Sequence, residues 1–170
     1  MRNFGVRAIL ALACAGACGK GKGTATDTTA NAAQPAPSAG ATAVVDGATA
    51  YQRCATCHQV NGTGLPGTYP PLAGSEFIGA SDPSAAIRIV LHGLQGTVTV
   101  RGQTYSGVMP PFGTGVPMSD EEVAAVLTHE RSSWGNSAPA VTAAMVARER
   151  AATASQQTLW TADELKPLLK

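Results

Sequence analysis

Two cysteines and a histidine lie together in the short segment Cys54-Ala55-Thr56-Cys57-His58. On one helical turn, thiols at this spacing can both reach the vinyl groups of a single haem, and the adjacent histidine then falls against the iron. Two thioether bonds and one nitrogen ligand would hold such a cofactor permanently. The segment therefore predicts one covalently attached haem c, with Cys54 and Cys57 forming the thioethers and His58 binding the iron.

Three other uses of the two cysteines have to be weighed against haem attachment. A redox-active cysteine pair would be expected near a βαβ pattern, which the sequence does not show. A structural zinc site would need a second pair of ligands at suitable spacing, and none is visible. A coincidental match would leave two unexplained thiols in an exported protein, where free thiols seldom persist. Haem attachment is the interpretation that uses the cysteines and the histidine together.

The second axial ligand decides what an attached haem can do. A methionine thioether closes the iron and suits electron transfer, whereas an open position suits gas binding or peroxide chemistry. Met109 lies in Gly107-Val108-Met109-Pro110-Pro111-Phe112, where the two prolines hold the backbone extended and rigid. We expect Met109 to be this ligand. The alternatives, for which packing, capping or surface roles are simpler explanations, are Met118, Met145, His92 and His129, the last being the best spare ligand.

The loop after the motif contains Tyr69-Pro70-Pro71-Leu72. A ligating histidine usually donates its other ring N–H to a nearby carbonyl oxygen, which fixes the orientation of the ring. Proline stiffens a loop and has no N–H of its own to compete. We therefore expect this loop to supply the carbonyl.

Residues 1–18 resemble an export signal. Arg2 and Arg7 precede a short apolar run that cannot span a bilayer. Cys18 follows small residues in the manner of a bacterial lipobox, which predicts a lipid anchor at a membrane surface, with ordinary signal cleavage as the alternative. Cys14 is the competing lipidation site, but cleavage before Cys14 would leave a very short apolar run in the signal. Export predicts a periplasmic location.

The segment that follows the signal has a different composition. Residues 19–43 consist mainly of Gly, Ala, Thr, Pro and Ser, a composition typical of a flexible linker, which leaves 44–170 as the folded domain. The 170 residues carry 12 basic and 11 acidic side chains, so no excess of basic charge predicts nucleic-acid binding. Aromatic residues make up only 5% of the chain, and so small a core favours stabilisation by a cofactor.

The capping and periodicity signals predict mainly helices. Asp46 is a good N-cap for a first helix that leads into the haem motif, while residues 59–80 are expected to form an ordered loop. Ser81-Asp82-Pro83 begins a helix that Gly93 can end, and the alternation over 97–105 predicts a small β-hairpin. The remaining helices are expected from Ser119 to about Ser133, over about 142–154, and from Thr161 to Pro167.

Several stretches together resemble the class I c-type cytochromes, especially the bacterial single-haem domains also found fused to copper nitrite reductases and quinoprotein dehydrogenases. The resemblance covers about 46–168. The matching stretches are Cys54 to Gln59, Tyr69 to Ser75 (YPPLAGS), Ala86 to Gly93 (AIRIVLHG), Thr104 to Phe112 (TYSGVMPPF), Ser119 to Thr128 (SDEEVAAVLT) and Arg131 to Asn136 (RSSWGN).

The resemblance implies an all-α class I cytochrome c fold with a small β-hairpin, wrapped around one haem c. It implies His58 and Met109 as axial ligands and Pro70 as the residue whose carbonyl accepts the histidine N–H. It also implies that Gly47 and Tyr51 lie where the first helix crosses the helix beginning at Ser119. This chain has one residue fewer than usual between Tyr51 and the first cysteine, and His129 stands where tyrosine is common.

The function implied is that of a one-electron carrier and not of an enzyme. Its partners would be a dehydrogenase, reductase or oxidase in a periplasmic electron-transfer chain, with the protein either free or part of a membrane redox complex. The alternative is a haem-based sensor or small peroxidase with an open or displaceable sixth ligand. Arg88 can equally pair with a haem propionate or lie exposed on its helix.

Overall fold

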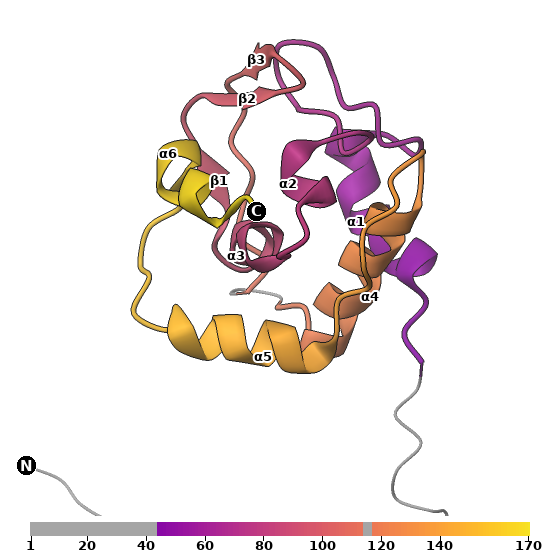
Figure 1. The fold of residues 1–170 in the computed structure, drawn as a ribbon, viewed down its shortest axis with the longest axis vertical. Coiled ribbons are helices and arrows are strands. Elements are labelled where there is room, and N and C mark those ends of the chain that lie inside the picture. Colours follow the sequence, from indigo (N-terminus) through magenta and orange to yellow (C-terminus); the bar gives the residue numbers. More distant parts are fainter. Residues whose placement is uncertain (1–43, 114–116) are drawn as a thin grey trace, which may run out of the picture. The chain divides into compact units, whose positions relative to one another are not determined.

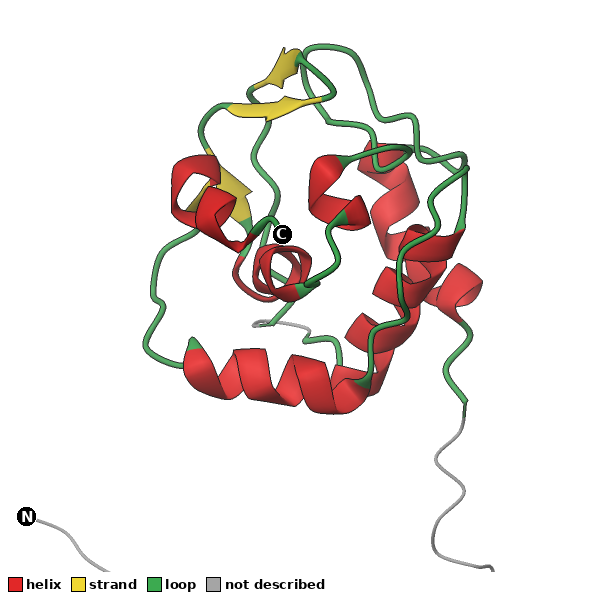
Figure 2. Ribbon diagram, viewed as in Figure 1, coloured by secondary structure: helices red, strands yellow, loops and turns green. Residues whose placement is uncertain are grey.

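The computed structural model describes residues 44–113 and 117–170. The predicted signal, the linker and Cys18 lie outside the described residues. The helices are α1 (Gly47–His58), α2 (Glu76–Gly79), α3 (Ser84–His92), α4 (Asp120–Ser132), α5 (Ala143–Ala152) and α6 (Ala162–Leu165), followed by the 3-10 helix η1 (Lys166–Leu168). The strands are β1 (Leu94–Gln95), β2 (Val98–Val100), β3 (Gln103–Tyr105) and β4 (Trp160–Thr161). Helices dominate the described residues (Figures 1 and 2), which confirms the predicted fold class.

Helices α1 and α4 lie side by side and cross closely (Figure 1). The crossing depends on Gly47, because a Cβ atom there would clash with the carbonyl oxygen of Ala125 on α4. The predicted N-cap is present, with the Asp46 carboxylate accepting a 2.9 Å hydrogen bond from the backbone N–H of Thr49. Tyr51 is buried at the crossing, where its ring lies 4.9 Å from that of Trp134. This packing fixes the helix that carries the haem motif.

Helix α4 begins at the capping box that the sequence predicts. The Ser119 side chain accepts from the backbone N–H of Glu122, and the Glu122 carboxylate accepts from that of Ser119. The residues that α4 buries in the main core are Val123, Val126 and Leu127. Met118, just before the cap, is buried in the same core, as expected of a hydrophobic staple.

Arg131 near the end of α4 is fully buried, which its place in the last turn did not predict. Its guanidinium donates to the carbonyl oxygens of Ile78 at 2.6 Å, Ala80 at 2.8 Å and Pro139 at 2.7 Å. These bonds satisfy the guanidinium without a carboxylate partner and join α4 to α2 and to the chain after α4. Since Ile78 lines the main cavity, Arg131 helps to fix that wall.

Helix α3 follows Ser81-Asp82-Pro83 as predicted, and Asp82 accepts a hydrogen bond from the backbone N–H of Ser84. It ends at Gly93, whose φ of 78° favours glycine. The hairpin of β2 and β3 is also confirmed, with Val98 paired to Tyr105. The expectation that 59–80 is loop throughout is wrong at α2, a single turn whose Phe77 and Ile78 are buried.

A second, parallel strand pair was not predicted. Leu94 of β1 pairs with Trp160 of β4, which comes from the far end of the chain. Helix α5 packs on α3 and α4 along one side of the molecule (Figure 1) and leads the chain back to this pairing. The C-terminal segment is thereby attached next to the strand that precedes the hairpin. No helix in the described ranges is long and apolar enough to cross a membrane.

Candidate haem site

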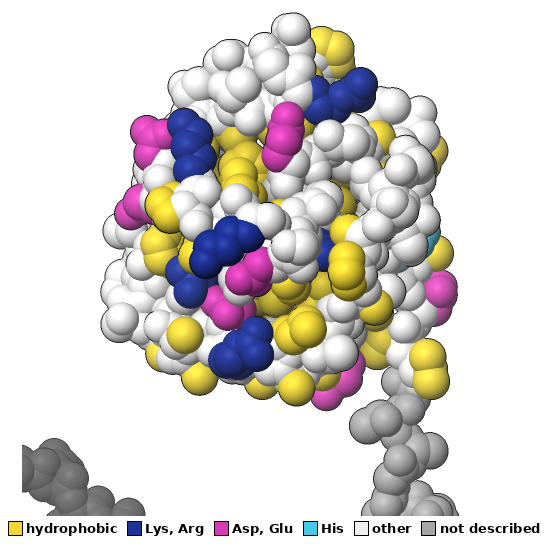
Figure 3. Space-filling view, viewed as in Figure 1, with side chains coloured by type: hydrophobic (Ala, Val, Ile, Leu, Met, Phe, Trp, Pro, Cys, Tyr) yellow, Lys and Arg dark blue, Asp and Glu magenta, His cyan; other side chains and the backbone are white. Residues whose placement is uncertain are grey.

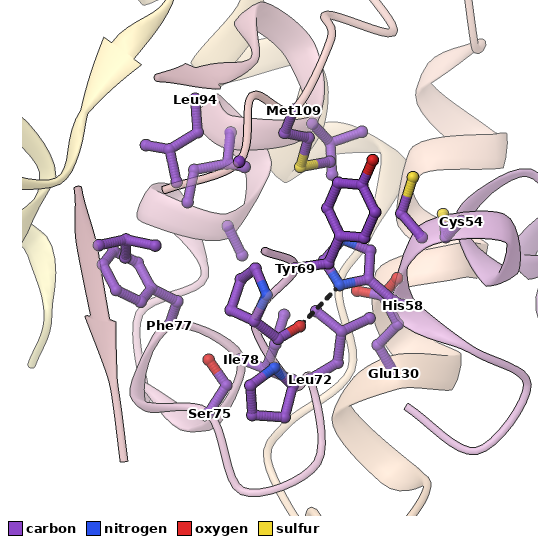
Figure 4. Close-up of a pocket in the computed structure, with 18 of the residues that line it drawn as sticks. Cys54, His58, Tyr69, Leu72, Ser75, Phe77, Ile78, Leu94, Met109 and Glu130 are labelled. Atoms are coloured by element: carbon purple, nitrogen blue, oxygen red, sulfur yellow. Dashed lines mark hydrogen bonds between the residues drawn. The ribbon is translucent and has the colours of Figure 1, made fainter. Parts of the chain in front are cut away.

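A cavity of about 380 Å³ lies between α1, α3, α4 and the segments that follow α1 and α3 (Figure 4). Its walls are mainly apolar, and representative lining residues are Leu72, Phe77, Ile78, Val90, Leu94 and Val100. The sequence-predicted residues Cys54, Cys57, His58, Pro70 and Met109 all line this same cavity. Residues far apart in the sequence are therefore brought to one apolar site.

His58 is the last residue of α1 and is 8% exposed. Its Nδ1 lies 2.9 Å from the carbonyl oxygen of Pro70, the bond dashed in Figure 4. A carbonyl oxygen only accepts, so Nδ1 carries the hydrogen and the lone pair of Nε2 is left for another partner. Burial lowers the pKa of His58, which favours the neutral imidazole that a metal requires.

The loop can approach His58 because residue 64 is glycine. Gly64 has φ +66°, and a Cβ atom there would lie 2.6 Å from the Pro70 carbonyl oxygen. Its N–H donates to the carbonyl oxygen of His58 at 3.0 Å. Glycine at this position therefore lets the loop fold back onto the end of α1 and deliver the Pro70 carbonyl to the imidazole.

Cys54 and Cys57 are free thiols one turn apart on α1. Burial, reinforced by the nearby Glu130 carboxyl, raises the pKa of Cys54 to about 12. Redox-active cysteines usually have a lowered pKa, so this thiol lacks the property that a catalytic pair requires. No three His, Cys, Asp or Glu side chains of the described residues converge as a metal-binding group, which leaves the zinc alternative without a ligand set there.

Met109 enters the cavity from the segment after β3 (Figure 4). Its backbone N–H donates to the Leu94 carbonyl at 2.9 Å, and its carbonyl accepts from the Leu94 N–H at 3.0 Å. Gly93 permits this pairing, because a Cβ atom there would lie 2.5 Å from the Met109 carbonyl oxygen. The Met109 segment is thus held by β1, which in turn pairs with β4.

The other four candidate ligands do not line the described part of the cavity. Met118 is buried in the main core, and Met145 is half-buried on α5. The Nε2 atom of His92 lies 2.7 Å from the hydroxyl oxygen of Thr153. The ring of His129 packs against those of Tyr51 and Trp134, at 5.5 Å from each. These positions agree with the packing and capping roles that their sequence contexts favour.

The sequence allows Arg88 either to pair with a haem propionate or to lie exposed on its helix. Its guanidinium instead forms a 2.8 Å ion pair with Glu149 of α5 and lies over the ring of Trp160. It does not line the described cavity. Arg88 therefore joins α3 to the C-terminal part of the chain.

Glu130 is a cavity residue that the sequence reasoning missed. It is 4% exposed, and burial raises its pKa to about 8. It lies three residues after Leu127 on α4, and both side chains line the cavity. This helical spacing is the signal that could have revealed it, because residues three apart share one face of a helix.

The residues present fit a covalently attached haem. The apolar lining suits the porphyrin, and the free thiols, the imidazole with an available Nε2 and the thioether of Met109 are the donor set of a histidine–methionine haem c. The Pro70 carbonyl supplies the outer hydrogen bond that such a histidine ordinarily makes.

Comparisons with known proteins identify the family of this chain. The sequence model of the cytochrome c family matches residues 44–134. A cytochrome c-552 of Thermus thermophilus is 46% identical over 99 residues, which cover 56% of this chain and 65% of that protein. The cytochrome c subunit of the quinone alcohol dehydrogenase of Gluconacetobacter polyoxogenes is 36% identical over 115 residues, 66% of this chain and 24% of the subunit.

A third relative is the gluconate 2-dehydrogenase cytochrome c subunit of Pantoea cypripedii, 41% identical over 108 residues, 61% of this chain and 24% of that subunit. The chain thus spans 65% of the Thermus protein's length and only 24% of each dehydrogenase subunit. The family match and the donor set lead to one conclusion: the chain belongs to the cytochrome c family, with a class I fold and a site suited to one covalently bound haem c.

Proposed function

We propose that this cytochrome is a one-electron carrier whose iron is held between Nε2 of His58 and the sulfur of Met109. In this proposal Cys54 and Cys57 form the two thioethers, and Pro70 fixes the histidine. The observation that carries it is the bond from His58 Nδ1 to the Pro70 carbonyl oxygen, which leaves Nε2 directed to a partner in a cavity that Met109 also lines. When bound, the haem supplies the one-electron couple of its iron.

The residues of the chain have separate tasks in this proposal. The His58 hydrogen bond holds the imidazole in one tautomer and raises its basicity as a ligand. Met109, held by its two backbone bonds to Leu94, would supply its thioether sulfur as the second iron ligand, which favours electron transfer over ligand binding. The apolar walls exclude water, and the low dielectric that they create would disfavour the more highly charged oxidised state of a bound haem and so raise its potential.

An optical spectrum of the holoprotein, oxidised and reduced, tests this ligation. We expect the weak far-red charge-transfer band of sulfur-ligated ferric haem in the wild type and its loss in Met109→Ala. Met145→Ala is the matched control, because Met145 does not line the described cavity, and it should keep the band. A wild type that lacks the band and binds carbon monoxide readily when reduced would favour the alternative, a haem sensor or small peroxidase.

The proposal extends to the whole chain and its location. Residues 1–18 would serve as an export signal, 19–43 as a linker and 44–170 as the cytochrome domain, with Cys18 carrying a lipid in the periplasm. The basic and apolar pattern before Cys18 supports export. Fractionation of cells tests the anchor: wild type should sediment with membranes and Cys18→Ala should not. A variant that still sediments would exclude Cys18 as the anchor.

We also propose a dehydrogenase as the electron donor and a reductase or oxidase as the acceptor. Support comes from the relatives named as cytochrome c subunits of an alcohol and a gluconate dehydrogenase. On the face shown in Figure 3, basic and acidic side chains are interspersed. Contacts with partners should therefore be small and only weakly sensitive to salt. Reduction of the holoprotein by a quinoprotein dehydrogenase and its substrate, followed at several salt concentrations, tests this.

A further inference from the structure

Glu130 is a carboxyl group inside the proposed haem cavity, and the electron-transfer proposal gives it no task. It is 4% exposed, and it shares one side of the cavity with Cys54 of α1 (Figure 4). A buried carboxylate ordinarily has a cationic partner, because the apolar interior disfavours an isolated charge. The described residues form no ion pair with Glu130.

The groups that face Glu130 do not supply a counter-charge. From α1, Tyr51 and the Cys54 thiol are its neighbours, and the thiol lowers the pKa of the Glu130 carboxyl against the larger effect of burial. Thioether formation would remove this effect of the thiol hydrogen, because a thioether sulfur carries no hydrogen. The Arg53 guanidinium, which also lines the cavity, lies over the Phe112 ring at 5.6 Å from its centroid.

The charged side chains on α2, α4 and α5 each interact with a group other than Glu130. Arg131 on α4 donates to three backbone carbonyls. On α2, the Glu76 carboxylate accepts from the backbone N–H of Arg101. On α5, Glu149 pairs with Arg88 and Arg150 pairs with Asp120. The nearest charge that changes during function would therefore be that of the haem iron, and burial already raises the Glu130 pKa to about 8.

The charge of the iron and the charge of Glu130 must influence each other. Oxidised iron carries one more positive charge than reduced iron, so it favours the carboxylate over the carboxylic acid. The effect is large in a poorly solvated interior, where charges interact more strongly than in water. The coupling is reciprocal, so a proton on Glu130 favours reduction as much as reduction favours the proton.

We propose that Glu130 is a redox-linked proton site, which takes up a proton from solvent when the haem is reduced and returns it on oxidation. The inference rests on the proposed haem attachment at Cys54 and Cys57. On reduction the iron gains one electron from the redox partner and the Glu130 carboxylate gains one proton, so the net charge of the site is unchanged. Oxidation reverses both transfers.

The direction of the pH dependence follows from this coupling. The pKa of Glu130 must be lower in the oxidised protein than in the reduced protein. Between those two values the midpoint potential falls as the pH rises. At full coupling, each pH unit changes the ratio of reduced to oxidised protein at a fixed potential up to tenfold, which corresponds to about 59 mV for one electron.

Spectroelectrochemical titration of the holoprotein at pH values on both sides of 8 tests the proposal. The midpoint potential of the wild type should fall as the pH rises. The midpoint potential of Glu130→Gln should not depend on pH in this range, and it should equal the higher value that the wild type has at low pH. The matched control is Glu149→Gln, which alters a buried carboxyl that is paired with Arg88 and does not line the described cavity. It should retain the wild-type slope. A flat wild-type titration, or an unchanged slope in Glu130→Gln, would overturn the proposal.

A second measurement needs no variant to fold. The redox difference infrared spectrum of the wild type should gain the C=O stretch of a protonated carboxylic acid on reduction, and deuterium oxide should shift that band. Absence of the band at a pH midway between the Glu130 pKa values of the oxidised and reduced protein would also overturn the proposal. The mass of the denatured protein shows whether haem is covalently attached, and it distinguishes failure of the Glu130 proposal from failure of the proposed function. A protein that carries haem but lacks the infrared band refutes only the role of Glu130. A protein that carries no haem refutes the proposed function.

Discussion

The carbonyl oxygen of Pro70 accepts a 2.9 Å hydrogen bond from Nδ1 of His58. This single contact sets the tautomer of the imidazole, since a carbonyl cannot donate in return. It exists because Gly64 allows the intervening loop to fold back against α1. The proximal half of the site is therefore prepared by the polypeptide, and the first prediction concerns the glycine that permits it.

Gly64→Ala should lower the free energy of unfolding by more than the left-handed backbone conformation at residue 64 alone explains. Alanine at φ +66° costs about 1–2 kcal/mol, and its Cβ would also press on the Pro70 carbonyl. Gly67→Ala is the matched control, because Gly67 has φ +74° with nothing within 4 Å of its Cβ. Denaturant unfolding of both holoproteins measures the difference. Equal losses would contradict the importance of the close approach.

The second prediction concerns the Met109 side of the cavity. In Gly93→Ala the added Cβ would lie 2.5 Å from the Met109 carbonyl, so the segment must shift and the far-red sulfur band should weaken or vanish. Gly96→Ala provides the control, since Gly96 has φ +79° and an open surrounding. An unchanged band in Gly93→Ala, with the protein still folded, would mean that the Leu94–Met109 pairing does not hold the ligand.

Stability should depend on pH through Glu130. Its folded pKa of about 8 is above the ordinary value of 4.5, so between these values the native state binds more protons than the unfolded state. The free energy of unfolding should therefore fall as the pH rises through this window, by at most about 1.4 kcal/mol per pH unit. Denaturant titrations of the reduced protein at a series of pH values should show this fall in wild type. Parallel curves for wild type and Glu130→Gln would refute it.

Arg131 should be among the most important residues for stability. Arg131→Met leaves the carbonyls of Ile78, Ala80 and Pro139 without their donor in a buried region, at a cost of roughly 3 kcal/mol or more. Arg148→Met is the control, because that side chain is 65% exposed and should change stability by less than about 0.5 kcal/mol. Thermal unfolding of the two variants gives the comparison, and similar midpoints would show that the buried bonds contribute little.

Much of the fold could be predicted because its signals are local. Asp46, Ser119, Thr142 and Thr161 each begin a helix within a residue of the predicted position, since a capping side chain acts on the next few N–H groups. The haem motif is likewise a local pattern. Its five residues indicate the proposed attachment segment without knowledge of the rest of the chain.

What could not be predicted depends on contacts between distant segments. The parallel pairing of Leu94 with Trp160 needs both ends of the domain in place, and two-residue strands carry no periodicity. The burial of Arg131 depends on carbonyls from α2 and from the chain after α4. Glu130 was missed because charged side chains usually lie at the surface, although its spacing from Leu127 indicates the inward face.

The pairing of β1 with β4 has a consequence for the order in which the molecule assembles. The bond between His58 and Pro70 joins residues close in sequence, whereas the strand that supports Met109 needs the far end of the chain. Closing a short loop costs less entropy, so local contacts form sooner than distant ones. We therefore expect the His58 side of the site to form before the Met109 side, which forms only after the C-terminal segment has docked.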